Sequence, residues 1–329
     1  MDFNSIYSAW NNFDFNYLLW LQNLRISINS ECLNNFMQNI SHFVALQACY
    51  GFALFAFVYW VFNKRFGLYI ATSFTAGHTL NAFEKLCACI YRPWILDTRI
   101  IPAGDAIATA TGYSFPSGHT SAVTTICGGM AIFLKKYGYK ILSYLFIALV
   151  MLIGFSRNYL GVHTLKDVLT ALITGIIVLF VVGKIFNFID KHRSSENIFI
   201  ILGVVLTFAI MYYVTHKDYP IDYLDGKLLA DPVKMQYDIW NDLGNVLGLL
   251  LGRLCEKYFI KFRPTGFNFK GVILNILGVV LLVLILNYSL SFFTGLIGAE
   301  YGRTLTSFVQ LFYIVAAWPL VLKIFGYSK

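Results

Sequence analysis

The sequence predicts an all-α fold, a polytopic membrane helical bundle of about nine spans. Of the 329 residues, 58% are hydrophobic and only 13% are charged. That is too little charge to cover a soluble globule, which excludes a soluble single-core enzyme. The apolar residues gather in runs of roughly 20, the length that crosses a bilayer core. Seven prolines among 30 Phe and 21 Tyr also exclude a disordered chain.

Nine runs are long and apolar enough to be expected as spans. In chain order they are Ser41–Phe62, Gly67–Tyr91, Ser117–Leu134, Ile141–Arg157, His163–Ile185, Ile198–Val214, Ile239–Leu254, Gly271–Phe292 and Leu305–Leu322. The seventh run is the weakest because Asp242 and Asn245 interrupt it. In the same run Gly244, Gly248 and Gly252 recur every fourth residue, which favours close helix packing over a ligand groove.

The first forty residues differ from the rest. The apolar stretch Tyr17–Leu21 is too short to cross a bilayer, and polar residues follow it at once. This pattern is typical of an amphipathic helix that lies in the membrane interface. The chain therefore divides into an interfacial segment at 1–40, a core of five spans at 41–195, and a C-terminal extension of four spans at 196–329.

The basic residues predict the orientation in the membrane. Alternate connections hold Lys64, Arg65, Lys135, Lys136, Lys140, Lys184, Lys191, Arg193, Arg253, Lys257, Lys261, Arg263, Lys270, Lys323 and Lys329. By the positive-inside rule these connections are cytoplasmic, which places the amino terminus outside and the carboxyl terminus inside. The formal net charge of +8 is mostly this asymmetry, so we expect no nucleic-acid partner. The six cysteines, mostly in apolar runs, indicate small core residues and no disulfide framework.

Ionisable residues in or beside spans are costly, so they are the first candidates for a functional site. They concentrate in three clusters, all at predicted extracytoplasmic ends of spans. The clusters are Lys85 with Arg92-Pro93, then Pro116-Ser117-Gly118-His119, then Ser156-Arg157 with His163 and Asp167. Taken singly, each cluster has an ordinary explanation as an interfacial anchor or a packed polar pair. Their joint occurrence on one side favours a site.

The three clusters contain the groups that phosphate chemistry needs. Lys85, Arg92 and Arg157 are cations, and the two arginines have the planar donor fork that suits phosphate oxygens. At the start of a helix, the backbone N–H groups of Ser117, Gly118 and His119 are expected to be free to bind an anion. These residues therefore predict an oxyanion site.

Two histidines and an aspartate supply the reactive groups. His163 and Asp167 are four residues apart on one helical face, so the carboxylate can keep one imidazole nitrogen protonated and leave the other as a nucleophile. His119 is available to protonate a leaving oxygen. We expect phosphoryl transfer through a phosphohistidine. No metal and no cofactor are expected, because the neighbouring cations would repel a metal ion.

These motifs resemble the three-part signature of the type-2 phosphatidic acid phosphatase superfamily over about Phe62–Gly183. The resemblance implies a helical core with a metal-independent site shared by two extracytoplasmic loops. His163 resembles the family's nucleophile, Asp167 its orienting carboxylate and His119 its general acid. The phosphate-binding positions are matched by Lys85, Arg92, Ser117, Gly118 and Arg157.

The chain departs from the common six-helix members of this family. It is predicted to have two spans before the first motif where those have three, and it adds spans after the core. This layout is similar to the glucose-6-phosphatase branch. In the second span, His78 and Asn81 lie on the same helical face as Lys85. They are expected either to line the substrate pocket or to form an internally satisfied polar network.

We therefore expect an integral-membrane phosphatase, a phosphoric monoester or diphosphate hydrolase. Its expected substrate is a lipid phosphate or a polyprenyl (undecaprenyl-type) diphosphate, hydrolysed at the extracytoplasmic face of a bacterial plasma membrane. Three alternatives stay open from the sequence. They are phosphoryl transfer to a lipid or sugar acceptor, hydrolysis of a sugar phosphate, and a transporter that only binds the phosphate.

Overall fold

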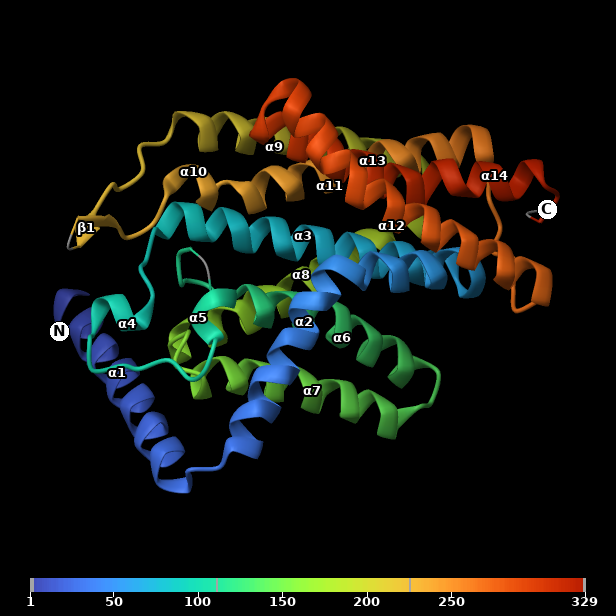
Figure 1. Cartoon of the computed structure of the whole chain (residues 1–329). Coiled ribbons are helices and arrows are strands. Elements are labelled where there is room, and N and C mark those ends of the chain that lie inside the picture. Colours follow the sequence, from blue (N-terminus) through green and yellow to red (C-terminus); the bar gives the residue numbers. More distant parts are fainter. Residues whose placement is uncertain (1–2, 111, 225, 328–329) are drawn as a thin grey trace. The chain divides into compact units, whose positions relative to one another are not determined.

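The structure is a computed structural model that describes residues 3–110, 112–224 and 226–327, with side chains except at 3–10, 43–51, 108–109, 224 and 227. Figure 1 labels its elements. In chain order they are α1 (Phe3–Ile28), α2 (Glu31–Phe57), η1 (Val58–Phe62), α3 (Lys64–Ala88), α4 (Pro93–Leu96), α5 (Ala106–Thr109), α6 (Gly118–Lys136), α7 (Lys140–Tyr159), α8 (Leu165–Lys191), η2 (Arg193–Ser195), α9 (Glu196–His216), β1 (Tyr223–Leu224), β2 (Lys227–Leu228), α10 (Pro232–Met235), α11 (Tyr237–Cys255), η3 (Glu256–Ile260), α12 (Phe269–Ile297), α13 (Ala299–Phe312), η4 (Tyr313–Ala317) and α14 (Trp318–Ile324).

The all-α prediction is confirmed, and the helix starts follow from local sequence. Ser117 is the N-cap of α6 and accepts a hydrogen bond from the Thr120 N–H. Asn268 caps α12 in the same way, with its Oδ1 accepting from Gly271 N at 2.7 Å. The polar insertion before α11 contains a short antiparallel pair, in which β1 residue Tyr223 faces β2 residue Leu228.

Among the described residues, five helical segments are long and apolar enough to cross a membrane. They are Lys140–Tyr159, Leu165–Lys191, Arg193–His216, Phe269–Ile297 and Ala299–Ile324. The other four predicted spans coincide with α2 and η1, α3, α6 and α11. These helices form. Of them, α3 is charged at both ends and α11 contains Asp242, which makes them less apolar. The span in α2 and η1 is described with side chains only from Phe52, as a shorter apolar stretch that ends at Phe62. The count of nine spans is therefore not confirmed.

The chain forms two compact units, and each unit is assembled from separate segments. Unit 1 consists of Met1–Ala48, Phe83–Ile177 and Tyr219–Met235. Unit 2 consists of Cys49–Ala82, Val178–Asp218 and Gln236–Lys329. The segment predicted at the membrane interface corresponds to α1 and the first part of α2, both in unit 1.

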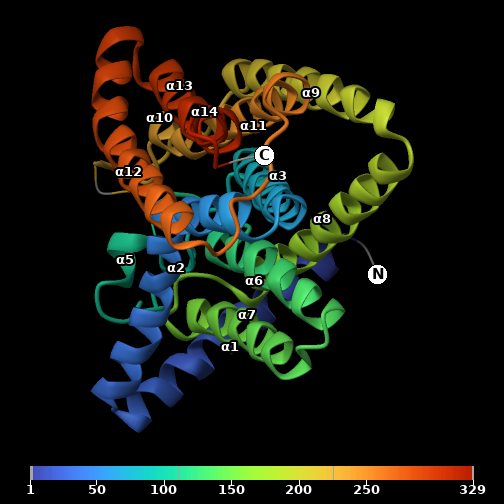
Figure 2. The ribbon, with the colours of Figure 1, turned by 90° about the vertical axis from the view of Figure 1, so that its right-hand side faces the viewer.

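In unit 1, α6 packs beside α7, as Figure 2 shows, and α1 also contacts α7. The first half of α8 lies close to α6. The closeness is evident at Gly175, where an added Cβ atom would overlap the side chain of Thr124. A separate apolar cluster joins the end of α7 to the loop before α6. Its buried members are Met37, Ala103, Ala106, Ala110, Tyr159, Leu160 and Val162. This cluster supports the segment that leads to His163.

In unit 2, α11 packs closely against α13. A Cβ atom at Gly244 would overlap the backbone of Thr304, and one at Gly248 would overlap the carbonyl oxygen of Phe308. Gly252 faces Val315 of η4 in the same way. The packing role predicted for this glycine stripe is confirmed. Small residues let the two helix backbones approach each other.

We predict that Gly248→Leu destabilises the protein, because a leucine cannot fit without separating α11 from α13. Overpacking of this kind costs about 1–3 kcal/mol or more when backbone must move. The measurement is the thermal unfolding midpoint of the detergent-solubilised protein. Gly295→Leu on α12 is the matched control, since no atom lies within 4 Å of its added Cβ. Equal midpoints for the two variants would contradict the packing.

Candidate active site

The eight residues predicted to bind or transform phosphate all belong to unit 1, where they lie at helix ends and in loops. They come from the last turn of α3, the residue before α4, the start of α6, the last turn of α7, and the connection from α7 into α8. In that order they are Lys85, Arg92, Ser117, Gly118, His119, Arg157, His163 and Asp167. Unit 1 therefore contains the whole candidate site.

His163 lies in a tight connection between α7 and α8. Gly161 has a φ of +74°, a conformation that glycine adopts readily. Asn158 fixes the turn by donating from Nδ2 to the His163 carbonyl oxygen at 2.9 Å. The fifth span was expected to begin at His163, but α8 begins at Leu165, so His163 precedes the helix by two residues and does not share its face with Asp167. Its side chain is buried, with 2% exposed.

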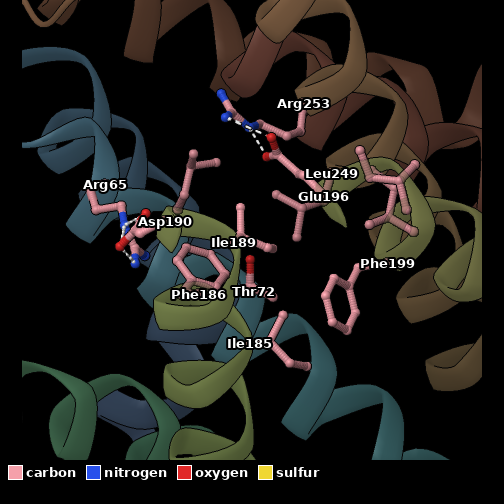
Figure 3. A pocket seen from close by; sticks show the side chains of 13 residues that line it. Arg65, Thr72, Ile185, Phe186, Ile189, Asp190, Glu196, Phe199, Leu249 and Arg253 are labelled. Carbon is pink, nitrogen blue, oxygen red and sulfur yellow. Dashed lines mark hydrogen bonds and ion pairs between the residues drawn. The ribbon is translucent and has the colours of Figure 1, made fainter. Parts of the chain in front are cut away.

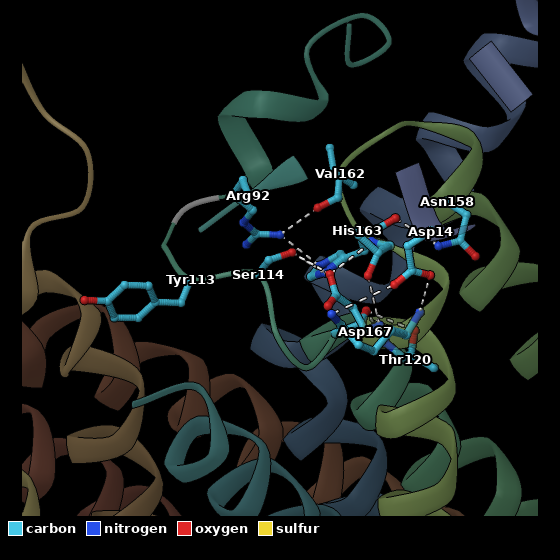
Figure 4. A network of polar contacts seen from close by, with 12 residues as sticks. Asp14, Arg92, Tyr113, Ser114, Thr120, Asn158, Val162, His163 and Asp167 are labelled. Atoms are coloured by element: carbon cyan, nitrogen blue, oxygen red, sulfur yellow. Dashed lines mark hydrogen bonds and ion pairs between the residues drawn. The ribbon is translucent and has the colours of Figure 1, made fainter. Parts of the chain in front are cut away.

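The His163 imidazole and the Asp167 carboxylate form a buried pair, shown in Figure 4. Nδ1 of His163 lies 3.2 Å from Oδ2 of Asp167. The same oxygen accepts hydrogen bonds from Ser114 Oγ at 2.5 Å and from the Thr164 N–H at 3.0 Å. Three donors thus hold one carboxylate oxygen in place, and the carboxylate in turn orients the imidazole.

Arg92 contacts the opposite nitrogen of the same imidazole. Its Nη1 donates to Nε2 of His163 at 2.9 Å and to the Val162 carbonyl oxygen at 3.1 Å, while its Nε donates to the Gly112 carbonyl oxygen at 2.9 Å. An arginine can only donate, so Nε2 is the acceptor. The proton of the neutral ring is then on Nδ1, facing Asp167. This tautomer leaves the Nε2 lone pair directed at the arginine.

Arg157 and His119 have buried polar atoms that lack a partner among the described residues. Arg157 is 1% exposed, and its Nη1 donates to Ser41 Oγ. Its Nε and Nη2 make no hydrogen bond within the described part of the chain, and neither does Nε2 of His119. Nε and Nη2 form one edge of the guanidinium, the edge that binds two oxygens of a phosphate. Unpaired buried donors of this kind indicate an anion site.

The start of α6 differs in one respect from the sequence-based expectation. The Ser117 N–H is not free, because it donates to the Asp167 carbonyl oxygen at 3.0 Å. Ser117 acts instead as the helix cap, with its Oγ accepting from Thr120. Gly118 and His119 are the first two residues of α6, and such positions leave their N–H groups without an intrahelical acceptor. The predicted anion-binding backbone thus begins at Gly118.

Positive charge surrounds His163. Burial lowers the pKa of His163 well below its usual range, and the nearby charges of Arg92, Arg157 and Lys85 lower this pKa further. His119 also lies within electrostatic range of these three cations and of His163. Lys85 is held by a hydrogen bond from Nζ to the Tyr113 carbonyl oxygen at 3.1 Å. The imidazole is therefore neutral at neutral pH.

His78 and Asn81 belong to unit 2. Nδ1 of His78 lies 2.8 Å from both carboxylate oxygens of Asp242 on α11. Asp242 is one of the polar residues that interrupt the seventh predicted span, and His78 is its partner. It supports the polar-network interpretation of His78, while the pocket role of His78 and Asn81 stays a prediction.

Sequence analysis missed the contribution of the N-terminal helix and of Ser114. The Arg25 guanidinium of α1 donates to the carbonyl oxygens of Tyr159 at 3.0 Å and Ile101 at 2.6 Å. Asp14 Oδ1 accepts from the Lys166 N–H at 3.2 Å, at the start of α8. Helix α1 therefore ties down both ends of the connection that bears His163. No spacing motif signals these contacts, because they join residues more than 70 positions apart.

A pocket of about 390 Å³ opens beside the His163–Asp167 pair. Ser114, Thr164 and Asp167 form one wall, and Asn11, Asp14 and Phe15 of α1 form another. Of the buried pair, Asp167 lines this pocket and His163 does not. Among the described residues, no group of three or more His, Cys, Asp or Glu side chains is arranged to hold a metal ion.

The chain is similar to one protein family and to several known proteins. The family model of the PAP2 superfamily matches residues 66–191, which include every residue of the three clusters. The undecaprenyl-diphosphatase BcrC of Bacillus subtilis is 30% identical over 191 residues, which cover 56% of this chain and 89% of that protein. The chain belongs to the PAP2 superfamily. As a PAP2 protein with helices apolar enough to cross a membrane, it is an integral-membrane phosphatase.

Two further PAP2 relatives match shorter stretches. The phosphatidylglycerophosphatase B of Bacillus subtilis is 29% identical over 118 residues, which cover 34% of this chain and 57% of that protein. The human sphingosine-1-phosphate phosphatase 2 is 30% identical over 110 residues, which cover 32% of this chain and 28% of that protein. No solved structure matches the chain significantly. The family match ends at the last residue of α8, so helices α9–α14 lie outside it.

We predict that Arg25→Met loosens the connection that carries His163. The variant keeps the apolar stem of the side chain but loses two hydrogen bonds from a charged donor, each contributing about 1.5–3 kcal/mol. Backbone amide exchange in residues 160–164 should accelerate by roughly tenfold or more. Arg99→Gln is the control, because this exposed arginine pairs with Asp97 two residues away. Unchanged exchange in Arg25→Met would show that α1 does not restrain the connection.

Proposed function

We propose that the protein hydrolyses a lipid phosphate or a polyprenyl diphosphate by attack of His163 on phosphorus. The observation that carries the proposal is the chain of contacts from Asp167 through the His163 imidazole to Arg92, next to the unpaired edge of Arg157. These contacts put a neutral, oriented imidazole beside donors suited to phosphate oxygens. The undecaprenyl and phospholipid substrates in the names of the relatives support this substrate class.

Binding of the phosphate uses the buried cations. The free edge of Arg157 takes two phosphate oxygens, and the N–H groups of Gly118 and His119 face a third. Lys85 adds charge from the end of α3. Arg92 moves its Nη1 donor from Nε2 of His163 to the incoming anion, which uncovers the lone pair at the moment the phosphorus atom arrives.

The reaction then follows in two steps. Nε2 of His163 attacks phosphorus and the bond from phosphorus to the leaving oxygen breaks. His119, which takes up a proton when the anionic phosphate is bound and offsets the neighbouring cations, donates that proton to the leaving oxygen. The Nδ1–H bond to Asp167 stabilises the positive charge that forms on the imidazole. In the second step His119 takes a proton from the water that attacks phosphorus, the bond from phosphorus to Nε2 breaks with its electron pair returning to the imidazole, and inorganic phosphate leaves. We propose that no metal takes part, because a metal cation would enter a site that already contains three cations.

The proposed location of the reaction is the extracytoplasmic face. Its support is the distribution of basic residues, which favours the opposite loops as cytoplasmic. A lipid substrate with its hydrocarbon chain in the bilayer presents its phosphate at the membrane surface, where the proposed site would lie. A bacterial plasma membrane fits a substrate of the undecaprenyl type.

We predict that His163→Ala abolishes phosphate release from lipid phosphates, measured with purified protein in the presence of EDTA. Asp167→Asn should lower kcat by about 10²–10⁴-fold with little change in KM, as for other oriented bases. His216→Ala is the matched control, since this exposed histidine bonds only within its own helix, to the Tyr212 carbonyl oxygen among the described contacts. Turnover by His163→Ala at the wild-type rate would reject the nucleophile, and loss of wild-type activity in EDTA would reject metal independence.

We predict an acid limb of kcat/KM that lies well below the ordinary histidine pKa of about 6.5. The lowered pKa of His163 keeps the imidazole neutral, so the nucleophile is lost only when the pH falls through that lowered value. Arg92→Gln removes a neighbouring positive charge, which raises the pKa of His163 and moves the acid limb to higher pH. Arg99→Gln should leave the limb in place. An unchanged limb in Arg92→Gln would contradict the electrostatic origin of the shift.

A further inference from the structure

Unit 2 contains a second pocket, of about 230 Å³, shown in Figure 3. Four helices form it: the first turns of α3, the last turns of α8, the first turns of α9, and the end of α11. None of the proposed catalytic residues lines it. Two of its four walls, α9 and α11, lie beyond the part of the chain that matches the PAP2 family.

The interior of this pocket is apolar. Most of its lining side chains are hydrocarbon or aromatic, namely Leu68, Ile185, Phe186, Ile189, Phe199, Ile200, Leu249 and Leu250. Neighbouring α9 residues expose apolar side chains, with Ile198 at 59% and Ile201 at 61%. A hydrocarbon chain from the bilayer fits such a pocket better than a soluble molecule.

Charged residues stand together at one end of the same pocket. Arg65 pairs with Asp190, with 3.1 Å between Nε and Oδ1, and its guanidinium stacks on Phe186 at 4.4 Å. Arg253 pairs with Glu196, with 2.7 Å between Nε and Oε1. Figure 3 shows the Arg65–Asp190 pair to the left of the apolar side chains and the Arg253–Glu196 pair at the top. The pocket thus has an apolar interior and a charged rim, the two parts of a lipid.

The charged residues that line the pocket are balanced, with Arg65 and Arg253 against Asp190 and Glu196, and the surplus of positive charge lies beside the rim. Next to the lining, Lys64 and Lys257 extend the ion pairs to Glu256 and Glu196. The connection from α8 to α9 adds Lys191 and Arg193, both exposed. The sequence predicts this side to be cytoplasmic, and anionic lipids are concentrated in the cytoplasmic leaflet. The surplus complements an anionic headgroup.

We propose that this pocket binds an anionic glycerophospholipid, with one acyl chain between α8 and α9 and its phosphate on Arg65. The side chains of Arg65 and Asp190 are 41% and 55% exposed. Exposed ion pairs contribute little net free energy, so a lipid phosphate can share the guanidinium while Asp190 remains hydrated. Arg253 is less exposed and uses its donors on Glu196 and Glu256, so it shapes the rim and leaves Arg65 as the anchor.

This lipid site is separate from the proposed reaction and does not depend on it. A bound lipid would stabilise the second half of α8 and the start of α9, the helix that carries the chain out of the family core. Because a ligand that binds only the folded state raises its stability, the site is detectable without any activity measurement.

The test compares unfolding midpoints of the full-length protein in nanodiscs of phosphatidylglycerol and of phosphatidylcholine with the same acyl chains. Native mass spectrometry counts the lipids that stay bound. Arg65→Gln removes the proposed anchor, and Ile189→Trp fills the pocket. The matched controls lie on α12, where Lys270→Gln removes an exposed charge and Ile273→Trp enlarges a side chain that is 51% exposed.

We expect the wild type and both controls to unfold at a higher temperature in phosphatidylglycerol and to retain a phosphatidylglycerol molecule. Arg65→Gln should lose most of the difference between the two lipids, and Ile189→Trp should lose the retained lipid. Equal midpoints of the wild type in the two lipids would overturn the anionic-headgroup assignment. An undiminished difference in Arg65→Gln would do the same, and this variant decides the matter even where Ile189→Trp fails to fold.

Discussion

Three hydrogen-bond donors converge on one oxygen of the buried Asp167 carboxylate. They come from Ser114 in the loop before α6, from the His163 ring, and from the Thr164 N–H at the start of α8. The Asp167 carbonyl oxygen also accepts from Ser117, the cap of α6. A single residue thus joins two segments that are separate in the sequence, 114–117 and 163–167. Their register sets the direction of the imidazole, and every step of the proposed reaction depends on that direction.

The candidate site was largely predictable from the sequence because its residues recur at short, fixed spacings. The spacing of four residues between His163 and Asp167 predicted that their side chains meet at the start of a helix. In the structure the two side chains are in contact. The free Ser117 N–H was a wrong expectation, since helix-start geometry alone does not reveal an acceptor that arrives from α8. Ser114 and Arg25 could not be found this way, because their partners lie far along the chain.

The fold was predictable to a similar depth. Apolar runs gave the helices, and the glycine spacing of α11 gave its close contact with α13. The runs did not establish how many helices cross the membrane, because α3, α6 and α11 combine apolar with charged or small polar residues. The division into two compact units could not be foreseen, since each unit combines distant segments and unit 1 takes in the insertion after α9.

The hydrogen bond from Arg92 to Nε2 of His163 has a consequence for the resting protein. A lone pair that already accepts a proton donor is a poor target for stray electrophiles, acids or transition metals. Only an anion that attracts the guanidinium more strongly than the imidazole does can release it. In the proposed reaction this contact would reserve the nucleophile for negatively charged partners, and would distinguish a phosphate from a neutral ester before any bond is made.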